Sequence, residues 1–287
     1  SYLAHEYLNG TWQPLFFTDV TAEMAGAKLE YVGSAALLEN IEAVSLPKKA
    51  RDALNAITDR RFRELLKDYA INQQFRRDIF VKGARSPTKV QQQQQLRATA
   101  LVPLKVRADM SLSFQTPMGE ANGQPEVYEP IMDAVAQGRT TIGEIEQTTG
   151  IELAKVQQAV TVLASSGQLH PAIPDVDPPP ARRLNAAVAD RALQGEPYRY
   201  LCAPVAANGI NANDVETTAL AALQQQPTDS PDDLARAVWQ RFNPIGRRLV
   251  KDGKPLKTEQ EHLEELRQRA ETIIERRVPV WRELGIL

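Results

Sequence analysis

The chain of 287 residues has room for two or three domains, and its 43% hydrophobic and 24% charged residues are typical of a globular protein. A formal net charge of −2 gives no general attraction to nucleic acid or to an anionic membrane, and a single cysteine, Cys202, excludes an internal disulfide framework. No apolar run is long enough for a membrane span and the first residues lack the basic start of a signal peptide, so we expect a protein of the reducing cytoplasm.

The N-terminal stretch 2–17 is dense in aromatic and polar side chains and has no clear helical or strand period. It places an imidazole, a carboxylate and an amide, those of His5, Glu6 and Asn9, among large aromatic rings. That composition is expected where a chain lines a cleft, so these three residues are candidates for a substrate or domain interface. The alternative is that they only satisfy one another and hold an irregular segment in place.

Residues 18–83 predict a short helix, two strands and a helical region between the strands. Acidic residues near the start and Lys28 near the end indicate a helix over 18–29, and alternation indicates strands at 30–35 and 78–83. One helix and two strands cannot close a sheet with a buried face. We therefore expect them to belong against another domain, and in the isolated chain to be covered by self-association or by the N-terminal segment.

The most basic stretch of the chain is 60–85, which holds eight basic and three acidic residues. Arg76 and Arg77 stand directly before the second predicted strand, where they could contact an anionic ligand, and they are two further interface candidates. The simpler interpretation is a strand entry whose arginines pair with Glu64 or Asp68.

The region 91–172 predicts a variable connection followed by a compact helical unit. The glutamine run 91–95 indicates a solvated helix end or a loop, 102–114 alternates like a strand, and 116–125 is rich enough in proline and glycine to be a linker. Residues 126–172 predict three helices, a glycine-containing turn and a strand, the pattern of a winged helix-turn-helix. Six acidic and two basic side chains give 126–170 a net charge of −4, which argues against DNA and favours protein docking.

The C-terminal region predicts a helical module. Pro178–Pro180 indicate a stiff extended spacer, and the last and strongest helix begins with a capping box of Thr258 and Glu261. His262 on this charged helix is expected to be solvated. The predicted fold class is mixed α/β, mostly helical, in three segments: an α/β segment at 1–115, a winged-helix-like module at 116–177 and a helical C-terminal module at 178–287.

No catalytic or metal-binding motif is visible. No glycine-rich phosphate loop or nucleophile elbow occurs, and the three histidines, His5, His170 and His262, are far apart and lack ligand partners at helical spacing. Cys202 has no activating neighbour. We predict no catalytic, cofactor-binding or metal-ligating residue in this chain.

Several segments carry a family resemblance. They are Ala4-His5-Glu6-Tyr7-Leu8-Asn9 with Trp12, Leu29-x-Tyr31-Val32-Gly33-Ser34-Ala35, Asn72-x-x-Phe75-Arg76-Arg77-Asp78-x-Phe80-Val81, Lys251-Asp252-Gly253-Lys254 and Pro279-x-Trp281-Arg282-x-Leu284-Gly285. Together they resemble the methyltransferase regulatory domain family over nearly the whole chain. The resemblance implies a region C-terminal to an S-adenosylmethionine-binding domain of the class I methyltransferase fold, in a family that includes bacterial protein lysine methyltransferases. It also implies that the predicted N-terminal helix and strands are the last pieces of the methyltransferase sheet.

The resulting prediction is the regulatory or substrate-recognition portion of an S-adenosylmethionine-dependent methyltransferase acting on protein, non-catalytic by itself. The cofactor would bind in an upstream domain, and none is expected in this chain. The expected partners are that catalytic domain, a polypeptide substrate and a second copy of the chain, but neither DNA nor a membrane. Two alternatives stay open: a stand-alone winged-helix nucleic-acid-binding protein, which retention on duplex DNA would reveal, and a methyltransferase with unrecognised cofactor-binding residues, which methyl-donor calorimetry would reveal.

Overall fold

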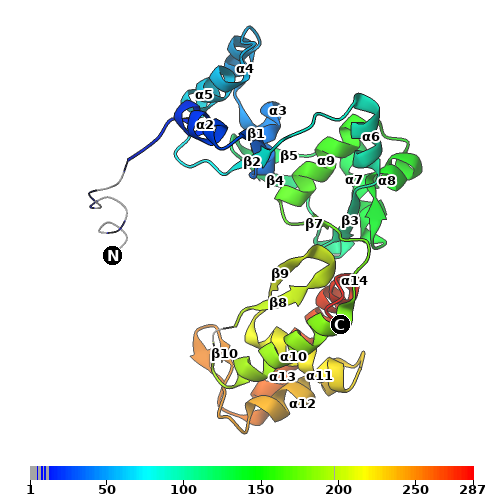
Figure 1. Cartoon of the computed structure of the whole chain (residues 1–287). Coiled ribbons are helices and arrows are strands. Elements are labelled where there is room, and N and C mark those ends of the chain that lie inside the picture. The colour runs from blue at the N-terminus through cyan, green and yellow to red at the C-terminus, as the bar shows by residue number, and fades with distance from the viewer. Residues whose placement is uncertain (1–4, 6–7, 9, 11–12, 197) are drawn as a thin grey trace. The chain divides into compact units, whose positions relative to one another are not determined.

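The computed structural model describes residues 5, 8, 10, 13–196 and 198–287. The chain forms two compact units: unit 1 runs to Gln92 and includes Ser113–Asn122, and unit 2 comprises Gln93–Leu112 and Gly123–Leu287. Helices dominate and the sheets are small, so the predicted mixed α/β, mostly helical class is confirmed (Figure 1). None of the helices in the described part is long and apolar enough to cross a membrane. The predicted division into three segments stays a prediction.

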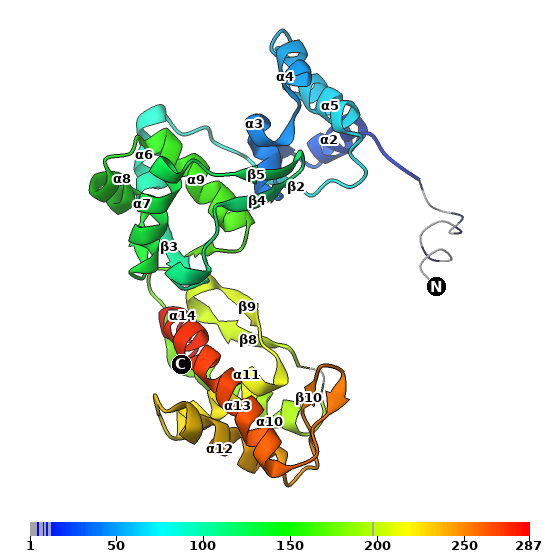
Figure 2. The same ribbon diagram turned by 180° about the vertical axis from the view of Figure 1, so that it is seen from behind.

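Unit 1 combines short helices with two antiparallel strand pairs. Its helices are α2 (Phe17–Gly26), α3 (Glu42–Ser45), α4 (Lys48–Leu54) and α5 (Arg60–Ile71), with the 3-10 helix η1 (Leu37–Asn40). Its strands are β1 (Leu29–Ser34), β2 (Asp78–Lys82), β4 (Ser113–Thr116) and β5 (Gly119–Asn122). The helix α6 (Lys89–Arg97), which contains the glutamine run, crosses from unit 1 into unit 2. The β4–β5 hairpin lies beside the β1–β2 pair in both views (Figures 1 and 2).

The β1–β2 pair has one packed and one uncovered face. The strands run antiparallel with Tyr31 opposite Phe80, and the Tyr31 ring packs edge-on against Phe17 of α2 with 4.9 Å between centroids. The helix α2 packs against both β1 and α5, which covers this face. Ile79 and Val81 flank Phe80 and therefore point to the opposite face, where they are 44% and 40% exposed. The predicted N-terminal helix and both strands are confirmed.

The first part of unit 2 packs three helices beside a three-stranded sheet. The helices are α7 (Pro125–Ala136), α8 (Ile142–Thr149) and α9 (Leu153–Ser165), as expected. The strands are β3 (Ala100–Pro103), β6 (Thr140–Thr141) and β7 (Leu169–Pro171), in the order β6-β3-β7. The central strand of this sheet, β3, thus comes before the three helices in the chain, whereas β7 follows them. The winged-helix assignment stays a prediction.

Two predictions for the region before α7 are wrong. The expected strand 102–114 is broken, because β3 ends at Pro103 and the 3-10 helix η2 (Arg107–Asp109) separates it from β4. Proline offers no backbone N–H and cannot extend the ladder. The expected linker 116–125 contains β5, because Pro117-Met118 form a two-residue turn that folds this strand back on β4.

The C-terminal part of unit 2 is a group of helices with two short hairpins. The helices are α10 (Pro178–Leu193), α11 (Asp214–Gln225), α12 (Pro231–Phe242), α13 (Glu259–Thr272), the π-helical turn η4 (Ile273–Arg277) and α14 (Val278–Glu283), with the 3-10 helix η3 (Pro204–Ala206). The hairpins are β8 (Tyr200–Ala203) with β9 (Asn208–Asn211), and β10 (Val250–Lys251) with β11 (Lys254–Pro255). The proline spacer is a wrong prediction: Pro178–Pro180 form the first turn of α10, where no intrahelical N–H bond is lost.

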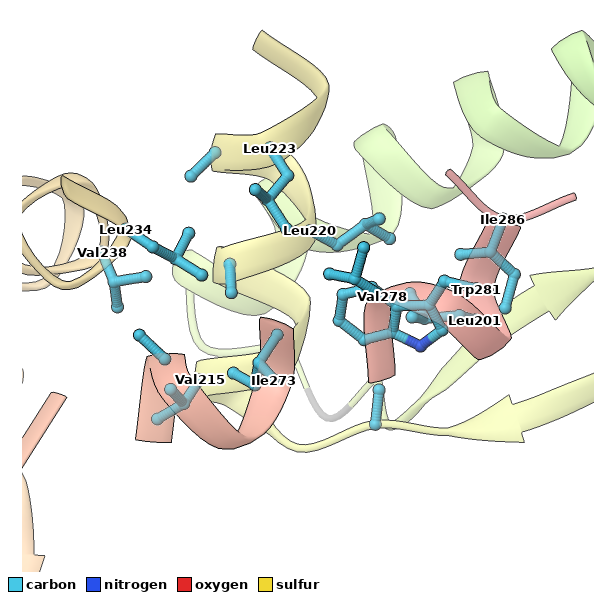
Figure 3. Packing of buried hydrophobic residues seen from close by; sticks show 14 of the residues in the cluster. Leu201, Val215, Leu220, Leu223, Leu234, Val238, Ile273, Val278, Trp281 and Ile286 are labelled. Carbon is cyan, nitrogen blue, oxygen red and sulfur yellow. The ribbon is translucent and has the colours of Figure 1, made fainter. Parts of the chain in front are cut away.

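The C-terminal helices enclose the main apolar core (Figure 3). Leu220 of α11, Leu234 of α12 and Trp281 of α14 are fully buried in it. His262 of α13 is also buried, with 1% of its surface exposed, and its ring stacks on Trp239 of α12 with 4.5 Å between centroids. The expectation of a solvated His262 is therefore wrong, because α12 covers this face of α13. Burial lowers the pKa of His262 and favours the neutral ring.

Candidate functional site

Arg76, just before β2, is the centre of an ionic cluster in unit 1. Its Nε and Nη2 atoms donate to the two carboxylate oxygens of Asp78, each at 2.9 Å, and its Nη1 donates to Asp68 of α5. Nη2 also donates to Glu64 of α5 at 3.2 Å and to the Tyr31 hydroxyl of β1 at 3.3 Å. One side chain thereby links β1, α5 and β2.

Aromatic and cationic neighbours close the cluster. The guanidinium of Arg76 lies over the Phe17 ring of α2 at 4.1 Å from its centroid, and Lys67 pairs with Glu64 at 2.8 Å. Since Nε, Nη1 and Nη2 of Arg76 all donate to protein groups, little capacity is left for a ligand. The pairing of Arg76 with Glu64 and Asp68 is the simpler of the two interpretations drawn from the sequence.

The pKa values of Glu64 and Asp68, two acidic partners of Arg76, shift in opposite directions. Burial alone would raise the pKa of Glu64, but hydrogen bonds and charge from Lys67 and Arg76 outweigh it and hold that pKa below its ordinary value. Burial raises the pKa of Asp68, and the nearby charges of Glu64 and Asp78 add to that rise. Burial and the charge of Glu64 raise the pKa of Tyr31 to about 12, so its hydroxyl stays a hydrogen-bond donor at neutral pH.

A cavity of about 660 Å³ lies next to this cluster, within the size range of small-ligand sites. It is bounded by α2, the turn into β1, the first turn of α5 and the end of β2. Phe17 and Tyr31, which also contact Arg76, belong to its wall. Its charged lining residues are Lys28, Arg60, Arg61, Lys82 and Glu30.

The cations of this cavity are mostly unpaired. Arg60 is oriented by the Tyr31 ring, 5.2 Å from its centroid, and donates to the Val32 carbonyl at 3.0 Å. Lys28, Arg61 and Lys82 are exposed and form no ion pair or side-chain hydrogen bond among the described residues. The cavity is therefore positively charged and open to a partner.

Unit 2 has a second cationic cavity, of about 620 Å³, beside α10 and α14. Arg182, Arg183 and Arg282 line it together with one acid, Asp229. Arg182 donates to the Leu287 carbonyl at 2.7 Å, which occupies part of its hydrogen-bonding capacity. No group of three or more metal-ligating side chains is present in the described ranges.

Residues 1–82 match the family described as predicted methyltransferase regulatory domain. The match is confined to the N-terminal part of the chain. This matched region contains α2, α5, β1 and β2, and with them the Arg76 cluster and most of the cationic cavity.

The similarity to known proteins extends beyond residues 1–82. The chain is 36% identical over 295 residues to an uncharacterized protein of Synechocystis sp. (sll1526), an alignment that covers 99% of the chain and 57% of that protein. Two solved structures of PKMT2 from Rickettsia typhi have the same fold at 16% identity. One covers 96% of the chain with a TM-score of 0.57, and the complex with AdoHcy covers 100% with a TM-score of 0.60. The chain spans about three fifths of the length of these relatives.

The five predicted interface residues have different surroundings in unit 1. Glu6 and Asn9 lie outside the described residues, and His5 is exposed. Arg76 is enclosed by its carboxylate partners. The exposed side chain of Arg77 has no partner among the described residues, and its backbone carbonyl accepts from the Ala35 N–H at 2.7 Å and the Ser34 hydroxyl at 3.4 Å. The structure does not bring His5 to Arg76, and the interface role of all five stays a prediction.

Sequence reasoning missed the cationic cavity of unit 1. Lys28 and Lys82 meet there because Leu29 pairs with Lys82 across the two strands. Arg60 and Arg61 join them from the start of α5. The one available signal was the basic stretch 60–85. That stretch contains both Arg76, which is paired with carboxylates, and Arg61 and Lys82, which are not, and the sequence does not distinguish them.

Proposed function

We propose that this chain is the regulatory and substrate-recognition portion of an S-adenosylmethionine-dependent methyltransferase that acts on protein. In this proposal a class I catalytic domain binds the cofactor and carries out methyl transfer, and the chain itself is not catalytic. Two facts support it: the match of residues 1–82 to the methyltransferase regulatory domain, and the fold shared with PKMT2, which was solved with AdoHcy.

The observation that carries the proposal is the uncovered apolar face of the β1–β2 pair. Ile79 and Val81 of β2 are 44% and 40% exposed, and Val32 of β1 is 41% exposed. A two-stranded sheet with one apolar face in water is marginal, and such a face favours burial against another protein surface. The relatives of this chain are longer than it is, and we propose that a catalytic domain covers this face.

The helices α7–α9 fit the same role as a docking module and not as a DNA reader. Their segment 126–170 carries a net charge of −4, which opposes binding to phosphates. In the proposal this winged-helix-like module contacts protein, either the catalytic domain or the polypeptide substrate. The protein works in the cytoplasm, where S-adenosylmethionine is made and used.

The docking proposal is tested with an Ile79→Asp and Val81→Asp double variant. The binding partner is the part of the Synechocystis relative that this chain does not cover, expressed as a separate polypeptide and titrated by calorimetry. We expect the wild-type chain to form a complex with it and the double variant to bind at least about tenfold more weakly, which corresponds to about 1.4 kcal/mol.

A Val90→Asp and Ile245→Asp double variant is the matched control. It changes the same two residue types at sites that are 63% and 51% exposed and are not part of the strand pair. Thermal melting of both variants checks that the fold is retained. Absence of any complex with the wild-type chain, or equal affinity of the strand variant and the wild type, would contradict docking through this face.

A further inference from the structure

The cationic cavity beside α2 and β1 concentrates positive charge in a chain that has none overall. Four cations, Lys28, Arg60, Arg61 and Lys82, face one acid, Glu30, whereas the whole chain has a net charge of −2. The charge is thus a local feature of this cavity and not the consequence of a generally basic protein.

Two other cations of α5, Arg63 and Lys67, are neutralised by carboxylates of unit 1. Arg63 of α5 forms a two-pronged pair with Glu42, with contacts of 2.9 and 2.7 Å, and Lys67 pairs with Glu64. The cavity cations come from the same helix and the adjoining strands but have no such carboxylates. A guanidinium left unpaired, such as that of Arg61, can bind a carboxylate through two parallel hydrogen bonds.

The shape of the cavity suits a chain segment more than a single small anion. Its volume of about 660 Å³ exceeds what one carboxylate fills, and Phe17, Ala25 and Leu29 give it an apolar wall beside the cations. Two strands that line it, β1 and β2, form a sheet of only two strands in the described residues. Arg60 and Asn40 bond backbone groups of Val32 and Ser34 on β1, so the outer edge of β2 is the one left for a further strand. Such an edge can pair with an extended peptide.

We propose that this cavity binds an acidic, extended polypeptide segment, so that the methyltransferase selects protein substrates with carboxylates near the methylated side chain. The inference rests on the proposed substrate-recognition function and adds the chemical class of the substrate. Arg60, held by the Tyr31 ring and the Val32 carbonyl, is the oriented cation, and Arg61, Lys28 and Lys82 surround the peptide carboxylates.

The test measures binding of a fluorescein-labelled peptide of about ten residues in which Glu and Leu alternate, so that all Glu side chains of an extended strand share one face. The full 287-residue chain is titrated into the peptide and anisotropy is recorded. We expect saturable binding that weakens when salt rises from about 50 to about 500 mM, since exposed charges are then screened. The same peptide with Gln in place of Glu should not bind.

An Arg61→Gln and Lys82→Gln double variant should bind the peptide at least tenfold more weakly. The matched control is Lys49→Gln with Arg85→Gln, which removes one lysine and one arginine that are also exposed and unpaired among the described residues of unit 1 but do not line the cavity. A second control, Arg183→Gln with Arg282→Gln, removes two positive charges from the cationic cavity of unit 2. Both controls should bind as the wild type does.

Three results would overturn the proposal. Equal binding of the Gln peptide would show that carboxylates are not recognised. Equal weakening in either control would show general charge attraction or binding in unit 2. Thermal stabilisation by inorganic phosphate or citrate without any peptide binding would show a small-anion site. These measurements need no catalytic domain. A negative result in them would therefore not affect the outcome of the docking experiment with Ile79→Asp and Val81→Asp, so the two proposals can fail separately.

Discussion

Unit 1 holds two groups of positive charge built from neighbouring residues, and they have opposite surroundings. Arg76 is enclosed by Asp68, Asp78 and Glu64 and retains 19% side-chain exposure. Arg60 and Arg61, at the other end of the same helix that carries Glu64 and Asp68, face a cavity with a single acid. Arg76 is paired and Arg61 is not because carboxylates surround only the first of these chemically identical side chains.

This contrast separates a structural charge from one available for binding. A buried guanidinium without partners would be costly, so the acids around Arg76 are needed for the fold. An exposed cation keeps its water and needs no acid, so an unpaired Arg61 costs the fold little and remains free for a ligand. Substitutions at the two sites should therefore affect different measurements: unfolding free energy at Arg76 and peptide binding at Arg61.

The largest expected effect on stability is that of Arg76→Met. It leaves three carboxylates without their common partner and removes the contact with the Phe17 ring, so we expect the free energy of unfolding to fall by about 3 kcal/mol. The matched control is Arg77→Met, whose exposed side chain has no partner in the described part of the chain and which should change stability by less than about 0.5 kcal/mol. Urea denaturation measures both, and an equal loss in the two variants would contradict the contrast.

The sequence predicted the local elements of unit 1 well because their signals are local. The helix α2 follows from charges near its ends, and the strands β1 and β2 follow from alternation within a few residues. The cationic cavity could not be predicted in the same way, since Lys28 and Lys82 become neighbours only through the pairing of β1 with β2. The possible partners of Arg76, Glu64 and Asp68, were visible because they lie within one basic stretch.

Wrong predictions concern two places in unit 2 and the β4–β5 hairpin of unit 1. His262 stands four residues before Leu266 and shares the buried face of α13, but the many charged residues of that helix hid this register. The ring of Trp239 from α12 stacks on it. Pro178–Pro180 are stiff in any setting, but the first turn of a helix accepts them because its N–H groups have no intrahelical partner. The β4–β5 hairpin depends on a two-residue turn whose Pro117-Met118 sequence gives a weak signal.

A smaller effect distinguishes the two α5 acids of the Arg76 cluster. The lowered pKa of Glu64 means that its ionised form stabilises the fold above the ordinary value of 4.5, and that this contribution is lost as pH falls through the lowered pKa. The raised pKa of Asp68 has the opposite sign: its protonated form is favoured in the fold, so its charge costs stability at neutral pH.

We therefore expect Glu64→Gln to lower the free energy of unfolding at pH 7 by about 1–2 kcal/mol. Asp68→Asn should change it little, because the lost pair with Arg76 is offset by removal of a charge whose burial is unfavourable. The gap between the two variants should narrow below pH 4.5, the ordinary value for Glu64. Urea denaturation at several pH values provides the measurement. A larger loss for Asp68→Asn at neutral pH would show that its pair with Arg76 outweighs the cost of its burial.

The smallest expected effect concerns the Tyr31 hydroxyl, which the ionic cluster and the cavity share. Burial first, and the charge of Glu64 second, raise the pKa of Tyr31 from 10.0 to about 12. The unfolded chain therefore loses the proton at lower pH than the folded chain does, and stability that is fully present below pH 10 should decline between pH 10 and about 12. Because Tyr31 is only half-buried, solvent screening should limit this decline to about 1 kcal/mol.

Tyr31→Phe removes the titrating group but keeps the ring on which Arg60 stacks. The plot of unfolding free energy against pH should therefore be flatter for this variant than for the wild type between pH 10 and about 12, while peptide binding at neutral pH is retained. Denaturation midpoints of both proteins are measured at each pH, and their difference removes the contributions that the other tyrosines and lysines make in both. If the unfolding free energy of both proteins fell equally with pH, ionisation of the Tyr31 hydroxyl would not affect stability.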